Sequence, residues 1–312
     1  MKNGFTMLKS DSGKWAAIIA LILMGILLSS NTFAKELKKL HEKDFAVKSG
    51  EKLKISAEVA DLNIRTWDKE EINIKVYGNN KAESRMQFEF EKTSYGVRIR
   101  AEKSGSWISN LFGTGIQAKI DIMAPKNFEL ELSTSGGDIT VGSLKGKQYI
   151  HTSGGDIELS NTEGNLNAIT SGGDIKVHKH FGWSKVETSG GDIIFKDCEG
   201  DVNGETSGGD ITVEARNGKI NLSTSGGDIK LYYKGDNRGI KLDTSGGDIY
   251  AFVPGDIKAN ADFSTSGGDV TNKIKATNAA KESSHKFIGE LNGGGNKFTA
   301  ETSGGDIVVK EK

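Results

Sequence analysis

The chain has 312 residues, of which 41 are glycine, only 2 are proline and one is cysteine, and its formal net charge is −1. Collagen is excluded because proline is nearly absent and no strict G-X-Y period runs through the chain. A hydrophobic content of 35% with so small a net charge argues against disorder. The balanced charge does not fit a basic nucleic-acid binder, and the lone Cys198 excludes a disulfide scaffold.

The first 34 residues have the pattern of a secretory signal peptide. Three lysines precede or flank the start of an apolar run of 13 residues from Ala16 to Leu28, and Thr32-Phe33-Ala34 supplies the small residues of a cleavage site. Because this run is shorter than the roughly 20 residues that span a bilayer, no stable transmembrane anchor is expected after cleavage at Ala34. We therefore expect an exported protein that works in the periplasm or at the cell surface.

Residues 35–127 show strand-like alternation without a complete repeat. Residues 60–64, Ala-Asp-Leu-Asn-Ile, resemble a worn copy of the repeat that follows, and Ile72, Ile74 and Val76 alternate as a strand does. Terminal units of a repeat protein are atypical because they cap the core. We expect this segment to form N-terminal capping coils, with a separate small β domain as the alternative.

Residues 128–312 are dominated by the string Thr-Ser-Gly-Gly-Asp, which occurs nine times. The copies begin at Thr134, Thr152, Thr170, Thr188, Thr206, Thr224, Thr244, Thr265 and Thr302. Successive spacings are 18 residues as far as Thr224 and then 20, 21 and 37 residues. A nearly fixed period of this length indicates an architecture in which each unit stacks on its neighbours.

We call the Thr-Ser-Gly-Gly-Asp turn of each repeat its corner. Each repeat carries two segments of alternating apolar residues, such as Leu166/Ala168 before the corner and Ile175/Val177 after it. The Gly-Gly pair permits positive φ or close backbone approach at the corner. The preceding Thr is expected to point inward and bond a backbone group. The sequence predicts an all-β fold, a parallel β-solenoid with 18-residue coils over residues 128–312. The long interval before Thr302 is expected to hide one further coil, with Leu291–Gly295 as its corner.

Repeated Ser-Gly-Gly-Asp-Ile together with the late Leu-Asn-Gly-Gly-Gly resembles the bacterial "putative adhesin" domain family, whose function is otherwise unknown. The resemblance covers residues 45–312. It implies a right-handed parallel β-helix located in the cell envelope or at the cell surface. It transfers no binding residue to this chain, because the family has none assigned.

One aspartate follows each glycine pair, and stacking would place these carboxylates one strand spacing apart. They are Asp138, Asp156, Asp174, Asp192, Asp210, Asp228, Asp248, Asp269 and Asp306. Carboxylates this close repel one another unless something compensates. We expect them to cap the corners by accepting hydrogen bonds from N–H groups and hydroxyls. A calcium-binding β-roll is the alternative, although one aspartate per 18 residues supplies few of the oxygens that Ca²⁺ requires.

A group of aromatic residues, Tyr232, Tyr233, Tyr250 and Phe252, follows two neighbouring corners. Alternation predicts that Tyr232, Tyr250 and Phe252 face outward from adjacent coils. Aromatic side chains on a rigid sheet can stack on sugar rings or anchor a protein. A cell-surface glycan or an envelope protein is therefore the expected partner. The alternative is that the rings pack on one another.

Three other features were candidates for a site. The apolar segment from Trp107 to Phe112 is expected to cover an open solenoid end, with a membrane- or partner-contacting tip as the alternative. His178 and His180 are expected to share a strand face, but two ligands without a third do not make a metal site. Cys198 has no basic neighbour to activate it as a nucleophile.

No hydrolase motif or phosphate-binding loop appears in the sequence. Parallel β-helices can carry polysaccharide lyases, so a carbohydrate-active enzyme is the least favoured alternative, after the calcium β-roll. We expect a non-enzymatic, adhesin-like structural module of the cell envelope, with no catalytic residue, metal or cofactor.

Overall fold

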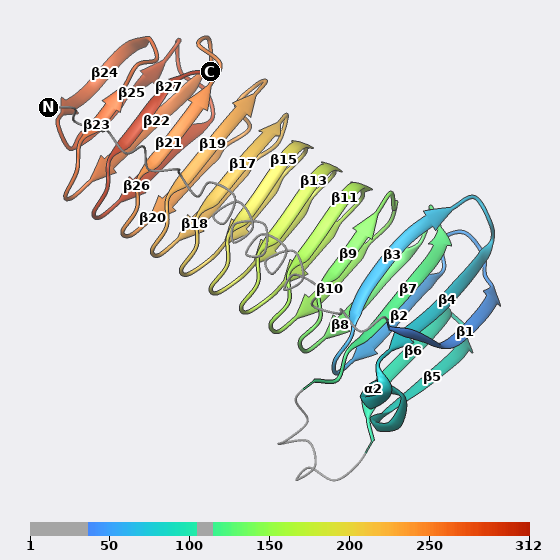
Figure 1. Ribbon diagram of the computed structural model, residues 1–312. Helices are drawn as coiled ribbons and strands as arrows, with labels where there is room; N and C mark the ends of the chain where they lie inside the picture. Colours follow the sequence, from blue (N-terminus) through green and yellow to red (C-terminus); the bar gives the residue numbers. More distant parts are fainter. Residues whose placement is uncertain (1–36, 105–114) are drawn as a thin grey trace, which may run out of the picture. The chain divides into compact units, whose positions relative to one another are not determined.

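The computed structural model describes residues 37–104 and 115–312. The predicted signal peptide and the Trp107–Phe112 segment lie outside these residues. The described chain consists of β-strands and one short helix, α2 (Asn80–Arg85). The strands form two sheets, which we call sheet A and sheet B, and each solenoid coil contributes one strand to each sheet (Figure 1).

Sheet A has 13 strands and contains the strand that follows each corner. In spatial order they are β1 (Lys38–Ala46), β4 (Glu71–Gly78), β7 (Ala118–Pro125), β3 (Asp61–Trp67), β9 (Ile139–Gly142), β11 (Ile157–Glu163), β13 (Ile175–Phe181), β15 (Ile193–Glu199), β17 (Ile211–Arg216), β19 (Ile229–Lys234), β21 (Ile249–Val253), β27 (Ile307–Glu311) and β23 (Val270–Asn272).

Sheet B has 14 strands and contains the strand that precedes each corner. In spatial order they are β24 (Ala276–Ser283), β25 (Lys286–Leu291), β22 (Ala259–Thr265), β26 (Lys297–Thr302), β20 (Ile240–Thr244), β18 (Ile220–Thr224), β16 (Val202–Glu205), β14 (Ser184–Glu187), β12 (Leu166–Ile169), β10 (Gln148–Thr152), β8 (Glu129–Thr134), β2 (Lys52–Ala57), β6 (Gly96–Lys103) and β5 (Met86–Thr93).

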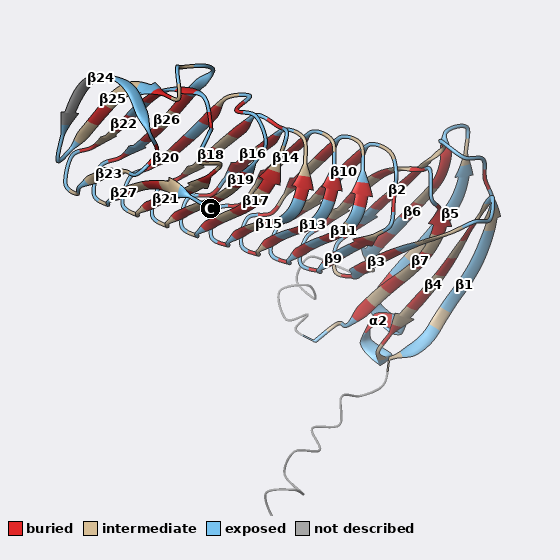
Figure 2. Cartoon of the chain, turned by 90° about the horizontal axis from the view of Figure 1, so that it is seen from above, coloured by how far each residue is buried: buried red, intermediate tan, exposed pale blue. Residues whose placement is uncertain are grey.

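The register between regular coils equals the sequence period. Ile157 pairs with Ile175, and Ile175 pairs with Ile193, in parallel ladders. Inward positions therefore form continuous apolar rows, and buried residues alternate with more exposed ones along most strands of the regular coils (Figure 2). Burial of one aliphatic side chain contributes about 1.5–3 kcal/mol, so these rows are the main source of stability. The predicted all-β parallel solenoid with 18-residue coils is confirmed.

The corners place the threonines inside, as predicted. Thr206 is buried, its hydroxyl donates a hydrogen bond to the Gly191 carbonyl of the preceding coil at 3.0 Å, and it accepts one from the Gly209 N–H at 3.4 Å. The second glycine of the pair is required by close backbone approach. A Cβ on Gly191 would lie 2.1 Å from the carbonyl oxygen of Gly173. Positive φ occurs instead at the opposite turn, as at Gly182, where φ is 135°.

The C-terminal coils do not stack in sequence order, and the prediction of a hidden coil is wrong. Strands β26 and β27 lie between the coil that contains β20 and β21 and the coil that contains β22 and β23 (Figure 1). Residues 276–291 form an antiparallel hairpin, β24–β25, which pairs with β22. Leu291–Gly295 begins at the end of β25 and turns towards β26, with φ values of 49°, 92° and 77° at Asn292, Gly293 and Gly294.

The N-terminal coils are also out of sequence order. The worn repeat at Ala60 and Asp61 is a true corner, because β2 and β3 pair in parallel with β8 and β9. On their other side β2 and β3 pair with β6 and β7. Strands β1, β4 and β5 then add antiparallel neighbours. Each end of the parallel stack is thus followed by antiparallel strands.

We predict that Gly191→Ala destabilises the protein far more than Gly190→Ala. The added methyl at position 191 meets the Gly173 backbone, which cannot move without shifting a coil, so a loss of about 3 kcal/mol is expected. A Cβ at position 190 has its nearest neighbour, the Gly172 oxygen, at 3.6 Å, which is ordinary contact. Denaturant unfolding of both variants measures the difference. Equal stability of the two variants would contradict the close-approach explanation.

Candidate ligand-binding surfaces

The aspartates of the corners form a hydrogen-bonded ladder. The Oδ1 atom of each aspartate except the last, Asp269, accepts the backbone N–H of the aspartate in the next coil, at 2.8–3.1 Å. In spatial order the ladder runs through Asp61, Asp138, Asp156, Asp174, Asp192, Asp210, Asp228, Asp248, Asp306 and Asp269. Asp61 was not among the predicted members of this row, although residues 60–64 form a degenerate copy of the repeat in which Asp61 occupies the aspartate position.

The ladder compensates for the repulsion between stacked carboxylates. At Asp174, the hydrogen bond from the Asp192 N–H and a second from Lys176 hold the pKa of the carboxyl below its ordinary value. Lys230 forms an ion pair with Asp228 at 3.6 Å. Within residues 37–104 and 115–312, no three His, Cys, Asp or Glu side chains are grouped so as to hold a metal ion.

The predicted aromatic residues lie on the outer face of sheet A, apart from one. Tyr232 and Phe252 are half-buried and stack with ring centroids 4.6 Å apart and an interplanar angle of 5°. The Lys310 ammonium lies 4.9 Å from the Phe252 ring centroid, and the Lys312 ammonium lies 5.5 Å from that of Tyr232. Tyr250, also half-buried, donates its hydroxyl to Asp248 Oδ2 at 2.9 Å, and this bond raises the pKa of the tyrosine.

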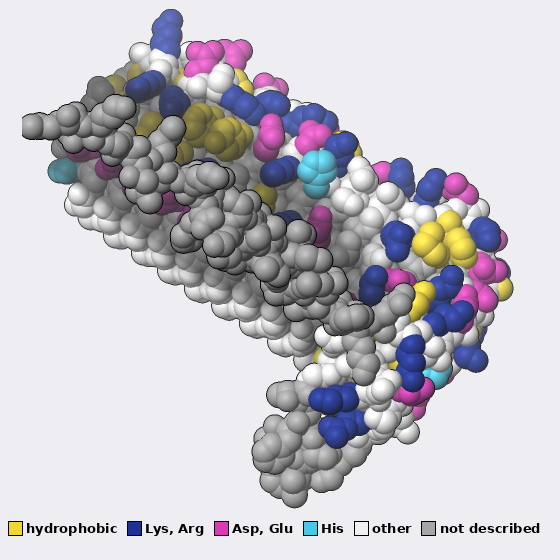
Figure 3. Space-filling model, viewed as in Figure 1, with side chains coloured by type: hydrophobic (Ala, Val, Ile, Leu, Met, Phe, Trp, Pro, Cys, Tyr) yellow, Lys and Arg dark blue, Asp and Glu magenta, His cyan; other side chains and the backbone are white. Residues whose placement is uncertain are grey.

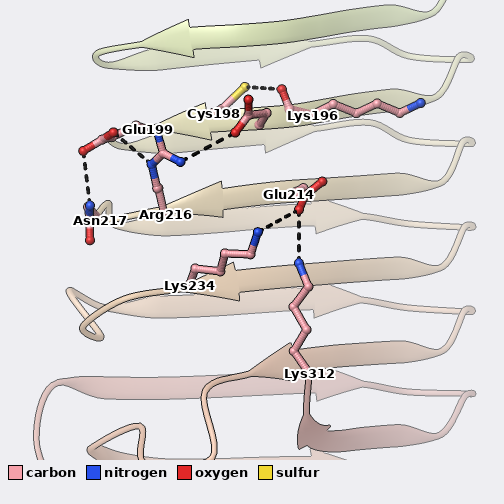
Figure 4. Close-up of polar contacts among 9 residues, drawn as sticks. Lys196, Cys198, Glu199, Glu214, Arg216, Asn217, Lys234 and Lys312 are labelled. Carbon is pink, nitrogen blue, oxygen red and sulfur yellow. Dashed lines mark hydrogen bonds and ion pairs between the residues drawn. The ribbon is translucent and has the colours of Figure 1, made fainter.

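The Glu214 carboxylate holds Lys312, one of the two lysines that lie over the aromatic stack. Glu214 pairs with Lys312 at 3.1 Å and with Lys234 at 3.4 Å (Figure 4). The hydrogen bond from Lys312 is the main reason that the pKa of Glu214 is below its usual value. We call Glu214, Tyr232, Phe252, Lys310 and Lys312 the aromatic–lysine cluster. It exists because β27 inserts beside β21 and brings the last residues of the chain to this face.

The prediction that Tyr233 belongs to a ligand-binding aromatic group is wrong. It is fully buried, because alternation from Ile229 and Leu231 turns it inward. Its hydroxyl hydrogen-bonds to the carbonyls of Gly218 and Asp236 at 2.9 and 2.7 Å, and burial raises its pKa. Tyr233 is a core residue and cannot contact a ligand on the surface.

The two histidines do not share a face. A positive φ of 56° at Lys179 breaks the alternation, so His178 is exposed whereas His180 is buried. The Nδ1 atom of His180 lies 2.9 Å from the Thr162 hydroxyl, and burial lowers the pKa of the ring. An equivalent kink at Asp197 turns Cys198 into the core, where its thiol contacts the Lys196 carbonyl (Figure 4). Burial raises the pKa of Cys198 to about 11.

A second aromatic site lies on sheet B and was not predicted from the sequence. Tyr149 and Trp183 are 48% and 43% exposed and flank a shallow groove of about 440 Å³. We call it the Tyr149–Trp183 groove, and its polar lining includes Lys52, Glu129, Glu131, Lys147, Asn165 and Asn167. The 18-residue period could have identified this groove from the sequence. Positions 147, 165 and 183 form one outward row, and positions 131, 149, 167 and 185 form the next.

The paired sheets and glycine corners define a β-solenoid domain. The family described as Toastrack DUF4097 matches residues 50–310. The chain therefore belongs to the Toastrack DUF4097 family, and the predicted resemblance to an adhesin-like family of unknown function is confirmed. No curated protein matches the sequence. Among the described residues, no helix is long and apolar enough to cross a membrane.

Three solved structures that are similar to the chain come from three bacterial species. A "putative adhesin" from Bacteroides fragilis is 14% identical, with 89% of this chain and 98% of that chain covered and a TM-score of 0.43. A "putative adhesin" from Parabacteroides distasonis is 12% identical, with coverages of 88% and 98% and a TM-score of 0.38. A "putative cell adhesion protein" from Clostridium sporogenes is 14% identical, with coverages of 89% and 100% and a TM-score of 0.24. Family membership rests on the Toastrack match and not on these structures.

We predict that millimolar CaCl₂ leaves the melting temperature of the protein unchanged relative to EDTA. In every ladder carboxylate except that of Asp269, one oxygen already accepts a backbone N–H. A cation bound to the folded state would raise the melting temperature by mass action. Differential scanning calorimetry in the two buffers makes the comparison, with MgCl₂ as the control for ionic strength. A rise specific to calcium would replace corner capping with the metal-binding alternative.

We predict that the Cys198 thiol is unreactive in the folded protein. With a pKa of about 11, roughly a thousandth of the thiol is ionised at about pH 8, whereas an unfolded cysteine with a pKa near 8.5 is substantially ionised. Ellman's reagent should therefore label the protein only after denaturant is added. Rapid labelling of the native protein would show that Cys198 is accessible.

Proposed function

We propose that this protein is an exported, non-enzymatic, adhesin-like module of a bacterial cell envelope, which holds a glycan or protein partner on the outer faces of its sheets. Membership of the Toastrack family and the secretory pattern of residues 1–34 support the envelope location. The observation that carries the binding role is the presence of surface aromatic rings on strands whose backbone is paired on both sides.

A paired strand is a favourable support for a binding residue. Tyr232 lies on β19, which is bonded to β17 and β21, and Tyr149 lies on β10, which is bonded to β8 and β12. Such rings are held in place before the partner arrives, so little conformational entropy is lost on binding. Lysine, arginine and acidic side chains lie among one another on the face shown in Figure 3, so long-range attraction of one charge sign is not the basis of the proposal.

The non-enzymatic part of the proposal is supported by the state of the titratable groups. In the ladder, the carboxylate of Asp174 accepts hydrogen bonds from the Asp192 N–H and from Lys176, and these bonds hold its pKa below the ordinary value. His180 and Cys198 are buried, and burial moves the pKa of each in the direction that keeps the group neutral. A general acid or base needs a pKa near the working pH and access to substrate.

We predict that the chain from residue 35 to residue 312 binds isolated envelope polysaccharide or envelope protein, and that Tyr232→Ala with Tyr250→Ala weakens this binding at least tenfold. Loss of aromatic anchors of this kind commonly costs more than 1 kcal/mol each. Co-sedimentation with envelope fractions measures the affinity. Thr212→Ala, an outward position on β17 of the same sheet, is the matched control.

Three outcomes separate the parts of this proposal. Undiminished binding by the doubly substituted protein, at an unchanged melting temperature, removes the aromatic–lysine cluster and Tyr250 from the contact surface. Failure of the unsubstituted chain to bind any envelope fraction overturns the adhesive role. Release of new reducing ends from the polysaccharide during the assay overturns the non-enzymatic role.

A further inference from the structure

We propose that the Tyr149–Trp183 groove on sheet B binds a neutral oligosaccharide built of pyranose rings. This inference rests on the proposed function and narrows its partner at this one site to a glycan. It is carried by three features of the groove, namely the placement of the two rings, an unpaired amide oxygen between them, and the pairing of every lysine and glutamate at the rim.

The two aromatic rings belong to coils that are second neighbours in the stack. Tyr149 pairs with Asn167 of the next coil, and Asn167 pairs with Lys185 of the coil after that, while Trp183 precedes Lys185 by two residues (Figure 2 shows β10 and β14). At the usual strand spacing the rings are separated by about 10 Å along the stack and about 7 Å across it. This separation suits two stacking subsites on one short oligosaccharide.

The rings are also unusual in their exposure. The large hydrophobic side chains that are well exposed in the described part of the chain are Tyr95, Tyr149, Phe181 and Trp183, and two of these four line this groove. A tyrosine or tryptophan at the surface presents a flat apolar face beside a hydrogen-bonding group, which matches the C–H face and hydroxyl rim of a pyranose ring. The two rings are held by the sheet in positions that a sugar chain can bridge.

Asn167, between the two rings, has an unused hydrogen-bond acceptor. Its Oδ1 atom is buried and has no partner within the described residues. Further along the same outward row, the Asn221 amide donates to Asn203 Oδ1 at 2.8 Å, so the row can satisfy such an oxygen. An unsatisfied buried acceptor destabilises the folded state. A sugar hydroxyl can satisfy this oxygen once the Asn167 amide turns toward the groove, and the exposed amide of Asn165 offers donors and acceptors as it stands.

The charges at the rim favour a neutral ligand. Lys52 and Lys54 both pair with Glu131, at 3.3 and 2.5 Å, and Lys147 pairs with Glu129 at 3.4 Å. A polyanion would have to break these pairs to engage the lysines. The chemistry therefore matches a short, uncharged sugar chain.

The test is titration of the purified chain with soluble neutral oligosaccharides (cello-, malto- and chito-oligosaccharides), with heparin as the polyanion. At least one neutral series should bind and change the tryptophan fluorescence, and Trp183→Phe should abolish the change in fluorescence. Tyr149→Ala and Trp183→Ala should each raise the Kd about tenfold or more, whereas Tyr149→Phe, which keeps the ring, should raise it less. Tyr95→Ala, which removes an exposed ring outside the groove, should leave the Kd unchanged.

The proposal is overturned if no neutral series binds, if heparin alone binds, or if Tyr149→Ala and Trp183→Ala together leave the Kd unchanged at an unaltered melting temperature. Envelope binding by the unsubstituted chain separates this failure from failure of the proposed function. If that binding persists and depends on Tyr232 and Tyr250, the adhesive role stands and only the sugar site on sheet B is lost. If it is absent, the adhesive role itself has failed.

Discussion

Backbone-to-backbone approach at the corners determines how this protein is built. Because Gly191 has no side chain, its Cα can lie directly over the Gly173 carbonyl. The same approach lets the Thr188 hydroxyl reach the Gly173 carbonyl and lets the Asp192 N–H reach the Asp174 carboxylate. Three coil-to-coil contacts thus depend on one missing methyl group. Repetition of this corner fixes the register of both sheets, and the register in turn aligns the apolar rows of the core.

The same register assigns different residues to stabilising the fold and to contacting a partner. Inward positions and corners carry the packing and the ladder bonds, while the outward rows of the strands are free to vary from coil to coil. Tyr149, Asn167 and Lys185 occupy equivalent outward positions on successive coils and differ completely in chemistry. A surface can therefore be assembled across coils from residues that are 18 positions apart, with little consequence for the fold. The Tyr149–Trp183 groove is built at this spacing, whereas the aromatic–lysine cluster joins coils whose paired residues are 18, 20 and 58 positions apart.

The sequence predicted what is periodic and missed what breaks the period. Alternation around Ile175 and the Thr-Ser-Gly-Gly-Asp corners was sufficient for the solenoid, the coil length and the inward threonines. The positive φ at Lys179 turns His180 inward, and neither residue type signals such a kink by itself. The order in which the coils stack could not be predicted either. The corner at Thr302 has the same local sequence whichever side of the Thr265 corner it occupies in the stack. The Tyr149–Trp183 groove was within reach, since residue numbers separated by 18 identify its rows.

The intercalated final coil makes completion of the fold depend on the direction of synthesis. Strands β20 to β23 leave the ribosome before β26 and β27, yet their two coils are joined through β26 and β27. Until residues 297–311 are available, two parallel edges stand open with no permanent partner. The coil that fills this gap brings Lys310 and Lys312 to the aromatic rings of sheet A in the same event. The aromatic–lysine cluster therefore forms only after β27 has been synthesised and has paired with β21.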